Sequence, residues 1–486
     1  MSLFVKKPLA QLLSTTDNDK GLKRTLGPAN LIALGIGAII GAGLFVRTAQ
    51  AAGDAAGGAV IFSFIIAAIG CAFAGLCYAE FASMIPVAGS AYTYAYVTMG
   101  EFLAWIIGWA LILEYALASA TVAISWSQYF NILWAKMFGQ PLPFQWTHSP
   151  FETDGVVNGI VNIPSLFILL LLTMVIVRGT KGSATVNSII VIVKVTIVLL
   201  FISLGWQFIN PVHHTPLMIP EGTPGHEGFN EWGIGGIFGG ASIVFFAFIG
   251  FDAVSTAAQE AKNPKRDMPI GILGSLFFCT ILYILFSWVL TGVAPWQDFI
   301  TAGKEASVAY AIEHYMPGYG WLSTFITIAI LMGFSSVILV MLLGQSRVFY
   351  TMASDGLMPK VFAELHPVSR TPYKSNWILL VFVSIFGGFV PLSVAGDLTS
   401  FGTLFAFVLV CVAVWIMRVK SPEVPRAFRT PLVPLVPILG ILICTALIIT
   451  LDQFTLKVAF SWMIVGLVIY FTYGKKNSVL QNKSEK

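Results

Sequence analysis

Four ionisable residues lie inside long apolar runs of the sequence: Glu80, Glu114, Lys194 and Asp252. A charged group within hydrocarbon is costly, so each needs a partner or a function. Lys194 is the most informative, because it lies about ten residues into its run, roughly 15 Å along a helix and near the middle of a bilayer. Burial favours the neutral form of lysine, which suits a proton carrier. A permanently charged lysine that donates to backbone carbonyls of a neighbouring span fits equally well.

The three acids suggest supporting roles. Glu114, in the segment ILEYAL, is expected to pair with a cation or to hydrogen-bond a broken helix within a polar network, without touching the substrate directly. Asp252 follows a glycine-rich stretch, where an acid caps the helix that begins after it. Glu80 lies nearer the end of its run, which predicts a partly solvated side chain.

Glycines interrupt two of the apolar runs at matching positions. The first reads LGIGAIIGAGLFV, with Gly35, Gly37, Gly41 and Gly43, and the other, five runs later, reads FFAFIGFDAVS around Gly250. Glycine costs a helix interior about 1 kcal/mol relative to alanine, so it indicates close helix packing or an unwound backbone. Both remain open for Gly35 and Gly37, whereas the matched Gly41, Gly43 and Gly250 favour unwound segments at a transport site. Free N–H groups there attract an anion and free carbonyls a cation, so an amino acid zwitterion fits.

The composition requires a membrane. Of 486 residues, 10% are charged and 57% hydrophobic, whereas a soluble domain has about 25% charged residues. A net charge of +4 without a basic face argues against nucleic-acid binding. The cysteines lie in apolar runs and the histidines in polar connections, without metal-ligand spacing. The spans contain no HExxH or GxSxG motif, which argues against an intramembrane enzyme. They also show no rings of like charge, which argues against a channel.

Twelve apolar intervals are long enough to predict membrane-spanning helices. They are Ala29–Ala52, Gly58–Ile85, Phe102–Phe130, Ile160–Val177, Ala184–Phe208, Gly233–Ala257, Ile270–Val293, Tyr319–Tyr350, Asn376–Val390, Thr399–Met417, Leu432–Leu451 and Leu456–Tyr473. Most lysines and arginines fall on one side of these intervals, which predicts that both termini are cytoplasmic. The opposite side receives Arg47, Lys136, Lys304 and Lys457.

Four long segments carry a resemblance to a known family. They are GAIIGAGLFV in the first span, CYAEFASMIPVAGSAYTYAYVTMGEFLAWIIGWALILEY from Cys77, FFAFIGFDAVSTAAQEAKNPKRDMPIGI from Phe245, and GQSRVFYTMASDGLMP from Gly344. In this order they resemble the amino acid, polyamine and organocation transporter superfamily, and within it the cationic amino acid transporter family.

The resemblance implies an all-α polytopic membrane protein of twelve transmembrane helices. Its fold is a five-plus-five inverted repeat of the leucine-transporter type, in which helices 1 and 6 are broken. The chain then divides into a cytoplasmic segment (1–28), a first repeat with helices 1–5 (29–209), a second with helices 6–10 (232–419), helices 11–12 (430–474) and a cytoplasmic tail (475–486).

The resemblance also implies the substrate site. Backbone N–H groups of Ala42, Gly43 and Leu44 would meet the substrate carboxylate. Carbonyls at Ile39 or Ile40 and at Phe246, Ala247 and Ile249 would meet its ammonium group, and the Phe246 ring would close over it as an outer gate. Lys194, in IIVIVKVTIV, matches a lysine that takes the place of sodium in some bacterial relatives, which favours the proton as coupling ion and no other cofactor.

Departures from the family pattern shape the substrate prediction. Ala42 replaces a Ser or Thr that many relatives have, and Arg47 is unusual one turn later, where it would narrow or steer the outer path. Phe334 and Met332 are bulky and would shorten the pocket, with Phe334 a candidate gate residue. We therefore expect a secondary active transporter in the cell membrane that imports neutral L-amino acids. A cationic amino acid transporter or exchanger, an uncoupled facilitator and a small accessory membrane subunit stay open.

Overall fold

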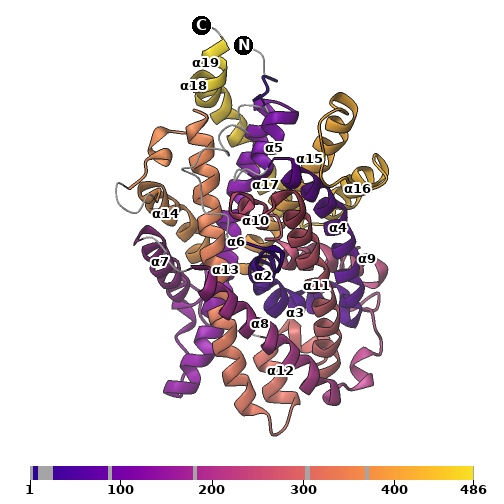
Figure 1. The fold of residues 1–486 in the computed structure, drawn as a ribbon. Coiled ribbons are helices and arrows are strands. Elements are labelled where there is room, and N and C mark those ends of the chain that lie inside the picture. Colours follow the sequence, from indigo (N-terminus) through magenta and orange to yellow (C-terminus); the bar gives the residue numbers. More distant parts are fainter. Residues whose placement is uncertain are drawn as a thin grey trace.

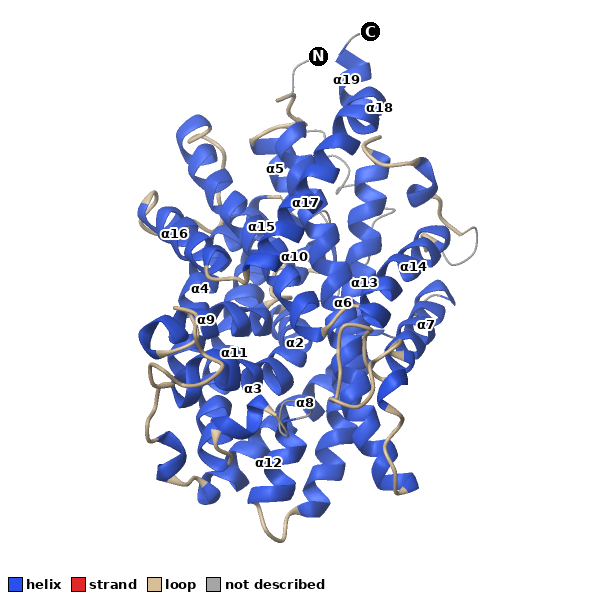
Figure 2. Cartoon of the chain, turned by 180° about the vertical axis from the view of Figure 1, so that it is seen from behind, coloured by secondary structure: helices blue, strands red, loops and turns tan. Residues whose placement is uncertain are grey.

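The computed structural model describes residues 4–8, 26–85, 90–178, 183–301, 307–366 and 371–484. Within these ranges the chain is helical, with two isolated bridges, Leu26 to Ala261 and Thr153 to Asn158, and no strand. Figure 2 shows helices joined by loops throughout. The all-α prediction is therefore confirmed for the described residues.

The first half of the chain contains the first broken helix and four further apolar helices. The broken helix begins with α2 (Pro28–Ile39). Its second part consists of a π-helical segment (Gly43–Arg47), α3 (Thr48–Ala51) and another π-helical segment (Ala52–Ala56). The helices that follow are α4 (Val60–Met84), α5 (Ser90–Thr98), α6 (Glu101–Phe138), α7 (Ile163–Arg178) and α8 (Ser183–Gly205).

The second half begins with the other broken helix. It consists of α9 (Gly233–Phe245), a 3-10 turn (Phe246–Phe248) and the short α10 (Ala253–Thr256). The remaining helices are α11 (Pro264–Val293), α12 (Ser307–Tyr315), α13 (Gly320–Ser354), α14 (Tyr373–Phe389), α15 (Leu392–Lys420), α16 (Leu435–Ile449), α17 (Gln453–Ile469), α18 (Lys475–Asn477) and α19 (Val479–Ser484).

Eight helical stretches in the described residues are long and apolar enough to cross a membrane. Four shorter apolar helices, α2, α7, α14 and α16, have 10–17 residues, whereas a full crossing takes about 20 residues. The structure therefore supports a polytopic membrane protein. The predicted number of twelve crossings stays a prediction.

The first broken helix lies in the middle of the molecule. In Figures 1 and 2, α2 lies at the centre of the bundle in both views, and α7, α14 and α16 lie toward its edges. Helix α2 contacts α8, α11 and α13, and the long helices α6 and α13 pack against each other. The short helix α2 is therefore surrounded by longer helices.

Both ends of the described chain meet at one end of the bundle (Figure 1). Lys7 Nζ lies 2.7 Å from Asp355 Oδ1, and the N–H of Val479 donates to the carbonyl of Asp355. Glu101, at the start of α6, accepts hydrogen bonds from Tyr96 at 2.8 Å and Gln481 at 2.6 Å. The two described ends therefore lie at the same end of the bundle, and their cytoplasmic location stays a prediction. Some basic residues used for that prediction lie outside the described ranges: Lys20, Lys23, Arg24, Lys181, Lys304, Arg370 and Lys486.

Candidate functional site

The first break lies between Ile39 and Gly43. Helix α2 ends at Ile39, Ile40 has an extended backbone (φ −72°, ψ 105°), and the second part of the helix starts at Gly43. The last carbonyls of α2 and the first N–H groups of the second part have no partner within their own helices. The negative end of the α2 dipole and the positive end of the dipole of the second part therefore face the same region.

The second break follows the 3-10 turn that ends at Phe248. Ile249 is extended (φ −62°, ψ 136°), and Gly250 has a φ of +111°, a conformation that residues with a side chain rarely adopt. Helix α10 starts at Ala253. The backbone conformation of the second break therefore requires a glycine at position 250.

The two breaks touch each other. A Cβ atom added at Gly43 would lie 2.2 Å from Cα of Ala247, and one added at Gly250 would lie 2.9 Å from the carbonyl oxygen of Ala38. Gly43 thus serves close approach at the first position of a helix, and is not itself unwound as the sequence suggested. Gly35 also serves packing, because an added Cβ would lie 2.4 Å from Oγ of Ser275 on α11.

A small cavity lies between the two breaks. Five residues predicted for the substrate site line it: Ile39, Ala42, Gly43, Phe246 and Ile249. The other three predicted residues, Ile40, Leu44 and Ala247, belong to the breaks but not to the lining. The N–H of Leu44 already donates to the carbonyl of Gly41 at 3.2 Å. The structure therefore brings five of the eight predicted residues together around one small cavity.

Sequence reasoning missed the opposite walls of the cavity. Ala118 and Val122 come from α6, and Val337 and Met341 come from α13. Each pair has the i, i+4 spacing that places two side chains on one helix face. That spacing was readable in the sequence, but such pairs recur in every apolar helix, and the signal does not say which face meets the site.

Lys194 reaches the first break from α8. It is buried, and its Nζ donates to the carbonyl oxygens of Gly37 at 2.8 Å and Ile40 at 3.0 Å. The lysine stem passes α13 at Gly333, where an added Cβ would lie 2.8 Å from the lysine Cε. The contacts are those expected of a tether, and a proton carrier at this position would act on the same carbonyls.

A tyrosine that was not predicted also binds the breaks. Tyr283 on α11 is fully buried, and its hydroxyl lies within hydrogen-bond distance of two carbonyl oxygens, of Ile39 at 3.0 Å and of Ala247 at 2.8 Å. Its ring packs against Phe64 and Phe248, with ring centroids 5.4 and 5.3 Å apart. One side chain thus connects both broken helices.

The two mid-membrane acids lie together next to the second break. Asp252 Oδ2 accepts a hydrogen bond of 2.8 Å from the hydroxyl of Tyr115, and its side chain does not cap α10, which corrects the capping prediction. Asp252 lies within electrostatic reach of Glu114, and both acids are buried. In the described residues the charged neighbour of Glu114 is therefore another acid, not the cation that the sequence allowed for.

Arg47 lies beside Phe246, one of the residues that line the cavity. It is fully buried, not placed in an outside segment as the charge count assumed, because it pairs with Asp397 on α15 and donates to Gln50 at 2.6 Å. Its guanidinium lies 5.9 Å from the centroid of the Phe246 ring. Gly396 permits this approach, since an added Cβ would lie 2.9 Å from the guanidinium carbon.

The two bulky residues of α13 lie elsewhere than the pocket. Phe334 is buried beside Phe45 and Tyr129, with ring centroids 6.1 and 5.7 Å away, and is not part of the cavity lining. Met332 is 44% exposed on the outer face of the helix, so it does not shorten the pocket.

Comparisons with known proteins identify the family. A family model described as "Amino acid permease" matches residues 26–471. The chain belongs to the amino acid permease family. It is 44% identical to the branched-chain amino acid permease BcaP of Bacillus subtilis and 40% identical to the methylthioribose transporter of the same organism, each over 99% of both chains. It is 33% identical to the vacuolar cationic amino acid transporter 4 of Arabidopsis thaliana, over 85% of this chain and 66% of that one.

The comparisons confirm the family resemblance drawn from the sequence. The matched proteins are named permeases and transporters, so this permease is a transporter and not an enzyme. Together with its apolar helices, this makes it a multi-pass membrane protein.

Glu80 has a structural role in this permease. The sequence suggested partial solvation, but the residue is buried and forms hydrogen bonds with Arg418 at 2.8 and 2.9 Å and with Arg426 at 3.0 Å. It also accepts a bond of 2.8 Å from the N–H of Thr430. Glu80 was misplaced because its partners lie more than three hundred residues away in sequence, where no local pattern reveals them.

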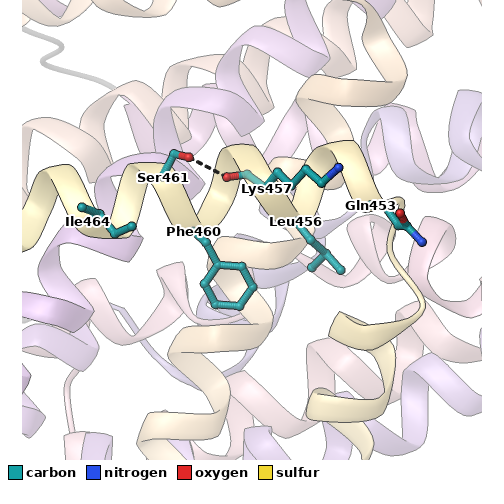
Figure 3. A pocket seen from close by; sticks show the side chains of 6 residues that line it. All are labelled: Gln453, Leu456, Lys457, Phe460, Ser461 and Ile464. Carbon is teal, nitrogen blue, oxygen red and sulfur yellow. Dashed lines mark hydrogen bonds between the residues drawn. The ribbon is translucent and has the colours of Figure 1, made fainter.

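A wider groove lies on the outer surface of α17 (Figure 3). It is lined by Gln453, Leu456, Lys457, Phe460, Ser461 and Ile464. Phe460 and Ile464 are 57% and 60% exposed, as expected for side chains that face lipid. This groove has no backbone break and no buried polar group, so it is not the substrate site of the permease.

Proposed function

We propose that this permease imports neutral L-amino acids across the cell membrane, coupled to protons, by alternating access. The proposed fold is the five-plus-five inverted repeat with helices 1 and 6 broken, and both termini are proposed to be cytoplasmic. Two broken helices that meet at one cavity support this arrangement, because irregular backbone within a membrane is tolerated where it lines a cavity.

The observation that carries the proposal is the lining of the cavity. Its side chains are small or aliphatic apart from the ring of Phe246, and no acid or base is among the lining residues. A basic side chain would need an acid to compensate its charge at this depth. A neutral amino acid fits this apolar lining.

The breaks offer the groups that an amino acid backbone needs. The N–H groups of Ala42 and Gly43 lie at the start of a helix, where a carboxylate is favoured. The carbonyls of Ile39 and Ala247 lie at the ends of the preceding half-helices, where an ammonium group is favoured. Phe246 would close over the substrate on the outer side, held by the Arg47–Asp397 pair next to its ring.

Proton coupling is proposed through Lys194. A protonated amine makes stronger, charge-assisted hydrogen bonds to carbonyls than a neutral one. Loss of the proton would therefore weaken the bonds to Gly37 and Ile40 and loosen the first break. The proton would in this way change the geometry of the groups that face the substrate.

The names of the relatives leave more than one substrate class. The name of the branched-chain amino acid permease favours an aliphatic amino acid as substrate. The methylthioribose transporter is only slightly less similar to this chain. A sugar derivative without an ammonium group would leave the carbonyl pair of Ile39 and Ala247 without its expected ligand. The geometry of the breaks therefore favours an amino acid.

The test is uptake of labelled leucine into proteoliposomes, with and without an inward proton gradient. A competition panel contains the twenty amino acids and methylthioribose. We expect accumulation only with the gradient, and competition by neutral aliphatic amino acids. Competition by arginine or lysine alone would favour the cationic transporter, dissipation without accumulation would favour a facilitator, and competition by methylthioribose alone would reject the amino acid substrate.

A further inference from the structure

The two carbonyls assigned to the substrate ammonium share a protein donor. The Tyr283 hydroxyl lies 3.0 Å from the carbonyl oxygen of Ile39 and 2.8 Å from that of Ala247. Both distances are ordinary for a hydroxyl donating to a carbonyl. Because the two oxygens belong to different broken helices, this contact links the first half of one to the first half of the other.

A single hydroxyl does not saturate this pair of acceptors. It carries one hydrogen, so at any moment it donates fully to one carbonyl, whereas an ammonium group carries three. Buried carbonyls without a donor are costly. A substrate ammonium has the same reach, and would satisfy both oxygens at once. The hydroxyl is therefore a weaker donor than the ammonium, which can bind the second lone pair that each carbonyl oxygen offers.

The surroundings keep the hydroxyl in this place. The tyrosine ring is fully buried between Phe64 of α4 and Phe248 of the second break. Helix α11 itself contacts α2, α4 and α8. The ring is thus held between α4 and the second break, and this packing sets the position of the hydroxyl.

We propose that Tyr283 is a positioning residue that replaces the substrate ammonium when the carrier returns without substrate. It joins the carbonyls of Ile39 and Ala247, so the two broken helices stay together during the unloaded half of the transport cycle. In the loaded half the substrate joins them, and the hydroxyl is dispensable. This inference rests on the proposed amino acid function and adds a role that the function alone does not require.

The proposal separates two modes of transport. Net uptake requires the carrier to return empty, whereas exchange of internal for external substrate moves a loaded carrier in both directions. Tyr283→Phe keeps the ring and removes only the hydroxyl. We expect net leucine uptake to fall about tenfold, the size expected when a buried acceptor loses its donor, while exchange stays within about twofold of wild type.

The matched control is Tyr129→Phe. Tyr129 is also fully buried and donates to a carbonyl of the first broken helix, that of Phe45, at 3.1 Å. That carbonyl accepts a second bond of 2.9 Å from Ser307, so it keeps a donor in the variant. We expect the ratio of net uptake to exchange to stay at the wild-type value.

A second measurement covers the case in which the variant is poorly folded. Thermal unfolding of purified protein is followed with and without saturating leucine. If Tyr283 replaces the ammonium, the substrate-free variant loses stability and the substrate-bound variant keeps it, so leucine raises the unfolding temperature more in Tyr283→Phe than in wild type.

Equal losses in net uptake and exchange, or an unchanged ratio together with an unchanged leucine shift, would overturn the role of Tyr283 and leave the proposed function intact. Wild-type protein that transports leucine in neither mode would reject the proposed function, and the inference with it. A lowered ratio in Tyr283→Phe but not in Tyr129→Phe supports the inference.

Discussion

The two broken helices reach similar shapes by different means. In the first, the extended residue Ile40 interrupts the helix, and no residue of the break has a left-handed backbone. In the second, an extended residue is followed by Gly250 in a left-handed conformation. The conformation of the second break is thus set by its own glycine, whereas the first break depends on side chains of neighbouring helices.

The side chains around the two breaks differ in the same direction. The carbonyls of the first break accept from Lys194 of α8 and Tyr283 of α11. The second break carries an acid, Asp252, which accepts from Tyr115. The carbonyls of the first break are held by a lysine and can respond to its proton, whereas the backbone of the second break is set by the conformation of Gly250. We therefore expect the first break to carry the coupling and the second to provide a fixed wall.

The largest effect is expected where the two breaks touch. Gly43→Val places a branched side chain where even a Cβ would lie 2.2 Å from Cα of Ala247. Because the clash involves backbone and not a flexible side-chain end, the breaks must separate, and binding and transport should both be lost. Substrate binding is measured by the leucine-induced shift in unfolding temperature, and transport by uptake.

The control for this variant is Gly320→Val, at the start of α13, where no heavy atom lies within 4 Å of an added Cβ. It should bind and transport like wild type. Normal leucine affinity in Gly43→Val would show that the substrate does not bind between the breaks.

The next effect tests the first break alone. Lys194→Ala removes the donor to Gly37 and Ile40 together with the candidate proton carrier. We expect gradient-driven accumulation to be abolished while some exchange or binding remains, because a loaded carrier needs no proton release. Lys457→Ala, an exposed lysine on α17, is the control and should accumulate substrate normally.

Full pH-dependent accumulation in Lys194→Ala would contradict the coupling role and reduce the lysine to a tether. Loss of exchange and binding together with accumulation would place its importance in holding the break, with no separate proton step.

A smaller effect is expected at the second break. Tyr115→Phe removes the hydroxyl that donates to Asp252, a type of bond worth about 1.5–3 kcal/mol. Since Gly250 sets the backbone there, transport should fall several-fold but proton dependence should persist. If this variant loses coupling as completely as Lys194→Ala, the two breaks do not differ in the way proposed.

The parts of this site that could be predicted were those with a local signal. Glycines in an apolar run, and a lysine within one, are visible without any partner, so both breaks and the position of Lys194 near them were predicted. Tyr283, Val337 and the Arg47–Asp397 pair were not, because their roles depend on residues far away in sequence. The burial of Glu80 and the role of Asp252, which does not cap α10, were wrongly predicted for the same reason.

The smallest effect on the rate of leucine transport is expected at the cavity wall, where a change alters the choice among substrates. Val337 lines the cavity, and its Cγ2 lies 3.2 Å from where a Cβ on Gly41 would be, so it forms the wall over the first break. Val337→Ala removes two methyl groups beside the substrate, and differences of this size change discrimination by about tenfold. Larger neutral side chains such as phenylalanine should gain in kcat/KM relative to alanine. Val348→Ala, at a buried position of the same helix outside the cavity lining, should leave the ratio unchanged. If both variants shift the ratio equally, the effect comes from the stability of α13. If only Val337→Ala does, the wall over the first break selects the side chain, and coupling and specificity then both arise around the first break.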